Sequence, residues 1–411
     1  MPDHDTTARK FPPSVHPMPI AERELKTRIP NDGGVVVLWG YGLKLRIDRR
    51  HLTLEDGAGL ERRSARFAKA PAKIKRLVLL STDGYLSLEV VRWLHDAGAS
   101  LSILSPDGDV IAAFGPTRLD DGRLRRAQAI APWTAAGLRI ARELLARKVA
   151  GQAAVLRAFD LGDDGQRAHV DEAASWLRGS DSTHSIEEFT LAEAIAAGTY
   201  WDAWAPITVR YAQKDEPHVP EHWRRFDARM SLVTGRSRRA SNPANALLNY
   251  LYALLEAETT IALRAYGLDP GLGVVHTDQP ARASFACDVM EAGRPEADRI
   301  VIELLRSRVF RVRDFIETPD GGCRLTTPIA RELAALTMRL GRAIGPAVEQ
   351  VVRILETTPL EPADGRLPRA RVANRKAPAL PTFLTQSRRS EGRASIRRAG
   401  TERVMIAPRC T

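Results

Sequence analysis

Residues 242–267 read NPANALLNYLYALLEAETTIALRAYG, and this stretch marks the larger part of the chain as helical. Asn242 followed by Pro243 is typical of a helix start, because proline lacks only a backbone N–H that the first turn leaves unpaired. The interior is rich in Ala and Leu, which favour a helix, and Gly267 is a typical residue to end one. We therefore predict a helix over 244–266.

Helical periodicity of the same kind extends from Asp120–Gly122 to about Thr357. Residues 123–159 are rich in Ala, Leu and Arg, with few clustered β-branched residues. The acidic, glycine-containing stretch 160–172 interrupts this pattern and indicates an exposed connection between two helices.

The chain before Asp120 has a different pattern, with short β-rich runs separated by turn residues. These predicted strands are 35–39, 43–47, 77–80 and 101–104. One helix is expected among them, capped by Ser87 and ended by Gly98. The sequence thus predicts an α+β fold, with a small β-rich N-terminal domain followed by a larger all-α domain.

Changes in composition divide the chain into four parts. We predict a flexible N-terminal segment (1–29), the β-rich domain (30–117), the helical domain (118–358) and a basic, disordered tail (359–411). Arginines accumulate in the tail among Pro, Ala and Ser, a composition that cannot bury a core. Such a tail either contacts nucleic acid or serves only solubility.

The charge of the chain favours a polyanionic partner. Its 411 residues carry a net charge of +11 and give a pI near 9.9, and nucleic acid is the leading candidate. Charges interrupt every apolar run, so no membrane span is predicted, and the N-terminus lacks the apolar centre of a secretory signal. Three widely spaced cysteines, Cys287, Cys323 and Cys410, are typical of a reducing cytoplasm and predict no disulfide framework.

Candidate chemistry is concentrated near the end of the helical stretch. Asp288 and Glu291 are three residues apart, which places both carboxylates on one face of a helix, close enough to share a cation. His276 follows an apolar run and adds an imidazole, a donor set that suits Mn²⁺ or Mg²⁺. Taken singly, His276 is more often a satisfied polar residue, and the two acids are more often a charge pair at a helix start.

Several motifs occur together: the stretch from Ser241 through Gly273-Val274-Val275-His276, then Asp288-Val289-Met290-Glu291 and Arg294-Pro295, and upstream Leu191–Trp201, with Glu193 seven residues before an aromatic pair. Together they resemble one family, the CRISPR-associated adaptation integrases, which are metal-dependent nucleases that insert captured DNA into a repeat array. The resemblance covers most of the chain and implies that Glu193, His276 and Glu291 are metal ligands, with Asp288 a catalytic neighbour. Relatives often carry Asp in place of Glu291. Alone, Glu193 would be read as a surface carboxylate.

The resemblance also implies an activity, a cofactor and partners. It implies phosphodiester hydrolysis and strand transfer with Mg²⁺ or Mn²⁺ as cofactor. It further implies double-stranded DNA as substrate, a homodimer formed through the β-rich domain, and a small ferredoxin-like companion protein. Two alternatives remain open: a structure-selective repair nuclease that cleaves branched DNA, and a nucleic-acid scaffold without catalysis.

Arginines close to these motifs in the sequence are candidates for binding DNA phosphates without base preference. They are Arg224, Arg225, Arg238, Arg239 and Arg282. Two acids in the long helix, Glu256 and Glu258, are assigned instead to helix-surface or packing roles.

Overall fold

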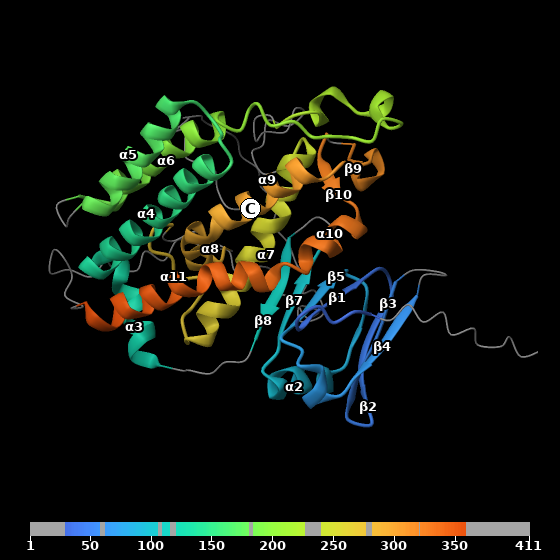
Figure 1. Cartoon of the computed structure of the whole chain (residues 1–411). Coiled ribbons are helices and arrows are strands. Elements are labelled where there is room, and N and C mark those ends of the chain that lie inside the picture. Colours follow the sequence, from blue (N-terminus) through green and yellow to red (C-terminus); the bar gives the residue numbers. More distant parts are fainter. Residues whose placement is uncertain are drawn as a thin grey trace, which may run out of the picture.

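The computed structural model describes residues 29–57, 62–105, 109–115, 121–180, 184–226, 240–276, 282–319 and 321–358. Within these ranges a β-rich N-terminal region is followed by a mostly helical one, which confirms the predicted α+β class (Figure 1). The predicted basic tail lies outside the described residues, as does nearly all of the predicted N-terminal segment.

The N-terminal region contains two four-stranded sheets and two short helices, α1 (Lys69–Ala72) and α2 (Leu88–Ala97). One sheet has the order β1-β5-β7-β8, with strands Val35–Trp39, Arg76–Leu80, Ser100–Leu104 and Val110–Phe114. The other has the order β4-β3-β2-β6, with strands Arg63–Phe67, His51–Asp56, Leu43–Asp48 and Gly84–Leu86. Each of the four predicted strands is confirmed to within one residue at its ends.

The first sheet is built from strands that are mostly apolar and mostly buried. β1, β5 and β7 run parallel, and their side chains are buried on both faces, which explains continuous runs such as VVVLW. β8 adds antiparallel at the edge and packs on the helical region. The predicted helix after Ser87 is confirmed as α2, and Gly98 ends it in the left-handed conformation at φ 65°.

The helical region begins after Phe114 and surrounds one long helix, α7. Its helices are α3 (Gly122–Ile130), α4 (Ala135–Ala158), α5 (Asp164–Gly179), α6 (Ile186–Asp202), α7 (Pro243–Ala265), α8 (Ser284–Met290), α9 (Arg294–Ser307), α10 (Thr327–Ala334) and α11 (Thr337–Thr357). Short 3₁₀ turns are η2 (Ala131–Trp133), η3 (Glu216–His218), η4 (Glu221–Trp223), η5 (Glu291–Gly293) and η6 (Val312–Asp314). The predicted helix over 244–266 is confirmed as α7, which the Asn242 side chain caps.

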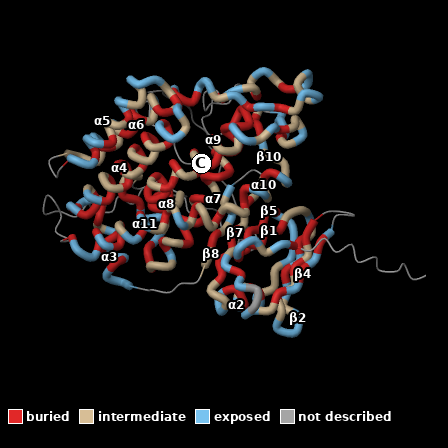
Figure 2. The backbone as a smooth tube through the Cα atoms, in the orientation of Figure 1, coloured by how far each residue is buried: buried red, intermediate tan, exposed pale blue. Residues whose placement is uncertain are grey.

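The core of the helical region gathers around α7. This helix is apolar on nearly all sides, as expected for a helix that packs against neighbours in every direction. Figure 2 shows buried segments running through the middle of the helical region. One small hairpin, β9 (Phe315–Glu317) with β10 (Cys323–Leu325), departs from the all-α expectation for this domain.

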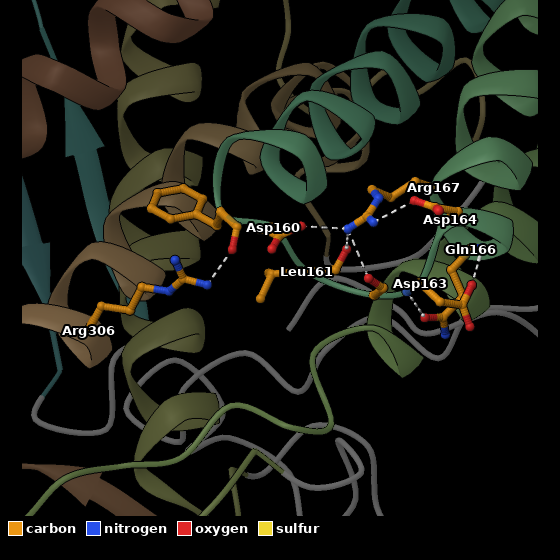
Figure 3. Close-up of polar contacts among 9 residues, drawn as sticks. Asp160, Leu161, Asp163, Asp164, Gln166, Arg167 and Arg306 are labelled. Atoms are coloured by element: carbon orange, nitrogen blue, oxygen red, sulfur yellow. Dashed lines mark hydrogen bonds and ion pairs between the residues drawn. The ribbon is translucent and has the colours of Figure 1, made fainter.

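The prediction of an exposed connection over 160–172 is wrong for most of that range. The turn is short, and α5 begins at Asp164. Asp163 caps the helix by accepting from the Gln166 backbone, while the Gln166 side chain accepts from the Asp163 backbone (Figure 3). This capping box is a local sequence signal for a helix start, and the prediction from acidic composition overlooked it.

Arg167 compensates the negative charge of the acidic residues around the turn before α5. Its guanidinium bonds Asp160 and Asp164 and also donates to the carbonyls of Leu161 and Gly162 (Figure 3). On the other side of the turn, Arg306 of α9 donates to the Phe159 carbonyl. The turn is therefore fixed from two sides.

An ion pair joins the two regions. Arg76 of β5 places Nε 2.8 and 2.9 Å from the two carboxylate oxygens of Glu258 on α7, and Glu258 is almost completely buried. Arg264, further along α7, donates to the Ala113 carbonyl of β8. Glu258 thus has a packing role, as predicted.

Two of the three cysteines, Cys287 and Cys323, are buried and take part in no disulfide. Across the described ranges, no helix has the length and apolar character needed to cross a membrane.

Candidate active site

The site forms where α4, α6 and η5 meet. Gly151 allows α4 to approach the start of α9 closely, since a Cβ added there would lie 2.5 Å from Cγ of Pro295. Lys148, one turn earlier on α4, is thereby brought against η5. On α6 the buried residues Phe189, Glu193 and Tyr200 recur at helical spacing, so Glu193 faces the same interior.

Two of the predicted ligands converge on one point. Oε1 of Glu193 and Oε2 of Glu291 each lie 2.5 Å from Nζ of Lys148. The two carboxylate oxygens are therefore separated by at most twice that distance. All three side chains are buried, which rules out the reading of Glu193 as a solvated surface carboxylate.

Glu291 has a second cationic neighbour. Arg294 places Nη2 3.2 Å from Oε1 of Glu291, and its guanidinium stacks 4.8 Å from the centre of the Tyr252 ring. Burial alone would raise the pKa of Glu291, but the charges of Arg294 and Lys148 outweigh it and hold this pKa well below its usual range. Burial likewise opposes the charge on Lys148, yet the two glutamates raise its pKa. Both shifts favour the charged forms of Glu291 and Lys148.

Asp288 holds the chain segment that carries His276. Its Oδ2 accepts from the backbone N–H groups of Val274 and Val275, at 2.6 and 2.9 Å, and its Oδ1 lies 2.6 Å from Nδ1 of His276. The segment folds back tightly at Gly273, where an added Cβ would lie 2.5 Å from the His276 carbonyl oxygen. Asp288 is thus a positioning residue.

The contact with Asp288 sets the state of the imidazole. Hydrogen bonding to Asp288 raises the pKa of His276, although burial and the nearby charge of Arg282 oppose this. Because a carboxylate only accepts, the proton of the neutral ring lies on Nδ1, and Nε2 carries the free electron pair. A carboxylate that fixes the far nitrogen in this way is the usual support of a metal-binding histidine.

The donor chemistry fits a hard divalent cation, which prefers carboxylate oxygens and accepts one imidazole. Glu193 and Glu291 are already gathered, and His276 lies near enough to Glu291 for their charges to interact. Over the part of the chain that the structure describes, however, no three His, Cys, Asp or Glu side chains form a group that could hold a metal. What lies between the two carboxylates is the ammonium of Lys148.

A further buried carboxylate, that of Asp298, links helices close to Glu193 and Glu291. Asp298 of α9 is fully buried and accepts from the hydroxyls of Tyr200 and Tyr252, at 2.9 and 2.5 Å. Tyr200 lies two turns after Glu193 on α6, and Asp298 lies two turns after Glu291. The contact therefore joins α6, which carries Glu193, to α9, which directly follows η5 and Glu291. Tyr252 is buried at the same point, as expected of a core residue.

The candidate DNA-binding arginines lie in different environments. Arg282 lies close to His276, since its charge acts on that imidazole. Arg225 is exposed, whereas Arg224 is paired with Glu216 at 2.6 Å and Glu221 at 3.2 Å. Arg238 and Arg239 lie outside the described residues.

Lys148 is not among the residues predicted from the sequence. A weak signal exists, because Lys148 lies four residues after the buried Leu144 and four before the buried Gln152, on the face of α4 that packs inward. A cation at such a position needs a buried anionic partner.

Comparison with known proteins relates the chain to one family. The family model described as CRISPR associated protein Cas1 matches residues 36–337. A CRISPR-associated endonuclease Cas1 of Archaeoglobus fulgidus is 26% identical over 317 residues, which cover 73% of this chain and 86% of the relative.

Solved structures share the fold. A casposase bound to its integration product superposes with a TM-score of 0.62 at 24% identity, covering 79% of this chain and 91% of that one. A Cas1 protein from Thermotoga maritima has a TM-score of 0.59 at 17% identity, covering 78% and 97%. At these identities the likeness establishes the architecture alone.

Proposed function

The chain belongs to the CRISPR-associated Cas1 family, and on that premise we propose that it is a metal-dependent DNA endonuclease and integrase of CRISPR adaptation. In this role it inserts foreign DNA fragments into the repeat array by transesterification. Named relatives are endonucleases, and a structural neighbour is described with its integration product, which supports both activities.

The observation that carries the proposal is the convergence of two buried carboxylates beside a histidine that a third carboxylate orients. Carboxylate oxygens together with one imidazole are the donors that Mn²⁺ and Mg²⁺ accept, so such a group favours a divalent cation. Glu193, Glu291 and His276 would hold Mg²⁺ or Mn²⁺. When bound, the cation would polarise a phosphate and stabilise the charge that develops on its oxygens.

The reaction exchanges one phosphodiester for another. The 3′ hydroxyl of a fragment attacks a phosphorus atom of the repeat and loses its proton, while the bond to the repeat strand's own 3′ oxygen breaks and that oxygen takes up a proton. Water in place of the hydroxyl gives endonuclease cleavage at the same site. Because one ester bond replaces another, no nucleotide hydrolysis is needed.

Other residues of the chain position the proposed metal ligands and supply positive charge for DNA binding. Asp288 keeps Nε2 of His276 available, and the Asp298 contacts join α6, which carries Glu193, to α9, which directly follows Glu291. Arg282 lies near enough to the imidazole for its charge to act on the site. Exposed arginines such as Arg225 would contact DNA phosphates, so DNA binding should weaken as salt rises.

The proposed partners follow from the family. They are double-stranded DNA, a second copy of this chain bound through the β-rich domain, and the small ferredoxin-like companion protein. Two insertions at opposite ends of one repeat need more than one active site, which is the geometric reason for an assembly of several copies.

The test is an integration assay with labelled fragments and a supercoiled plasmid that carries a repeat array, in Mn²⁺ and in chelator. We expect strand joining by the wild type in Mn²⁺, and loss of joining in Glu193→Ala and His276→Ala. The matched control is Glu187→Ala, which removes a first-turn acid of α6. If a variant that combines Glu193→Ala and His276→Ala joined DNA at the wild-type rate, catalysis at this site would be ruled out. If the wild type cleaved branched DNA but joined no fragments, the repair nuclease would be favoured.

A further inference from the structure

Lys148 is a buried cation in direct contact with both proposed carboxylate ligands. Its Nζ lies 2.5 Å from Glu193 and 2.5 Å from Glu291, and only 7% of the residue is exposed. The three residues come from α4, α6 and η5, which are separate elements of the helical region. The ammonium thus lies where the two carboxylates converge.

The charges of the cluster are already balanced by the chain itself. Glu193 and Glu291 carry two negative charges, and Lys148 and Arg294 carry two positive ones, with Arg294 also on Glu291. A divalent cation between the same carboxylates would face the ammonium of Lys148 at short range. In a buried site the repulsion between two such cations is screened only weakly.

The Nζ contacts engage the very oxygens that would face a cation lying between the two side chains. At 2.5 Å from each oxygen, the ammonium occupies the space in which a cation bound to both oxygens would lie. Nζ and a divalent cation therefore cannot both bind Oε1 of Glu193 and Oε2 of Glu291 in the arrangement described. Cation binding requires the Lys148 ammonium to move away from at least one of them.

We propose that Lys148 is a built-in counter-cation that competes with the divalent metal for Glu193 and Glu291 and thereby weakens metal binding. The inference rests on the proposed function, because it concerns the same metal site. The ammonium keeps the two carboxylates close together and compensated, and the metal gains them only by displacing it. Lys148 is thus a positioning residue that sets how much metal the enzyme needs.

The competing explanation is that Lys148 serves only as a buried structural ion pair joining α4, α6 and η5. The two explanations predict opposite signs. A purely structural lysine, once removed, would loosen the site and weaken metal binding. A competing lysine, once removed, would leave two uncompensated carboxylates and strengthen metal binding.

The deciding measurement is Mn²⁺ affinity of the full chain at fixed pH, by calorimetry and by the electron paramagnetic resonance signal of free Mn²⁺. The variant is Lys148→Met, which keeps the length of the side chain and removes its charge. We expect its Kd for Mn²⁺ to fall about tenfold or more. Its melting temperature should fall in chelator and recover with Mn²⁺ by more than that of the wild type.

Two further variants serve as controls. Arg147→Met removes the neighbouring positive charge on α4, which is partly exposed and paired with Glu143 rather than with the site, and it should leave the Kd unchanged. Lys148→Arg keeps the charge and should bind Mn²⁺ no more tightly than the wild type. A folded Lys148→Met chain whose Kd is unchanged or weaker would overturn the proposal.

Two other outcomes are also decisive. If Lys148→Met does not fold in chelator, saturable refolding by Mn²⁺ at lower concentrations than the wild-type Kd supports competition, and no refolding at any concentration overturns it. If the wild type itself binds no Mn²⁺, the proposed metal function fails. Mn²⁺-dependent joining by the wild type without tighter binding by Lys148→Met would reject only the role of Lys148.

Discussion

One carboxylate oxygen of Asp288 contacts both the ring and the backbone of His276. Its Oδ1 lies 2.6 Å from the imidazole Nδ1 and 3.2 Å from the His276 backbone nitrogen. One buried carboxylate therefore fixes both the place and the tautomer of the imidazole. The family resemblance implied that Asp288 is a catalytic neighbour of the ligands, and the structure gives it this supporting position beside His276.

Replacing Asp288 with Asn should weaken the site without unfolding the chain. The amide keeps the size of the side chain but not its charge, and loss of such a partner typically costs 10–100-fold in metal affinity or activity. Joining activity should fall by that order, and the pKa of His276 should drop, because the Asp288 hydrogen bond is the main cause of its raised pKa. Activity assays and an NMR titration of the histidine ring measure the two effects.

The control for Asp288→Asn is Asp202→Asn, an exposed residue at the end of α6. It should change neither quantity. An unchanged His276 pKa in Asp288→Asn would contradict the positioning role.

Removing Arg76 should destabilise the chain in a pH-dependent way. Arg76→Ala leaves Glu258 buried without its partner, which costs about 3 kcal/mol when the carboxylate is charged. Burial already raises the pKa of Glu258, and loss of Arg76 raises it further. Because the folded state then binds the proton more tightly than the unfolded chain, stability falls as pH rises through the folded pKa.

The destabilisation by Arg76→Ala should thus be larger at pH 8 than at pH 5, as measured by urea unfolding at both values. The exposed pair of Arg66 and Asp48 provides the control, and Arg66→Ala should change little at either pH. An equal cost of Arg76→Ala at both pH values would argue against a charged, buried Glu258 as its source.

Tyr200→Phe should destabilise the fold because it removes one of the two hydroxyls bound to the buried Asp298. A hydrogen bond to a charged group contributes about 2 kcal/mol. Combined with Tyr252→Phe, the loss should differ from the sum of the single losses, since both hydroxyls share one carboxylate. Urea unfolding measures this, with the exposed Tyr85→Phe as control.

Substitutions of the adjacent acids Asp163 and Asp164 should differ in their effect on the stability of α5. Asp163→Ala removes the side chain that accepts from the Gln166 backbone and should cost about 1 kcal/mol. Asp164→Ala removes only a fully exposed partner of Arg167 and should cause no measurable loss. Hydrogen exchange at the first turn of α5 checks the difference, and equal effects would contradict the capping box.

The sequence alone determined features that depend on near neighbours. Asn242-Pro243 and Gly98 marked a helix start and a helix end, and apolar runs marked the strands of the first sheet. Such signals act over a few residues, so they can be read directly from the chain. Where a local signal was overlooked, at Asp163, the prediction of a loop was wrong.

Only the tertiary structure decided which side chains meet. Arg76 and Glu258 are 182 positions apart, and Lys148 meets two glutamates carried by other elements. The sequence proposed Glu193, His276, Asp288 and Glu291 through motifs, whereas the helical spacing of Lys148 indicated only an inward-facing cation and not its place between the carboxylates. That depends on how closely α4 packs against η5, and close packing arises from the whole core rather than from any local pattern.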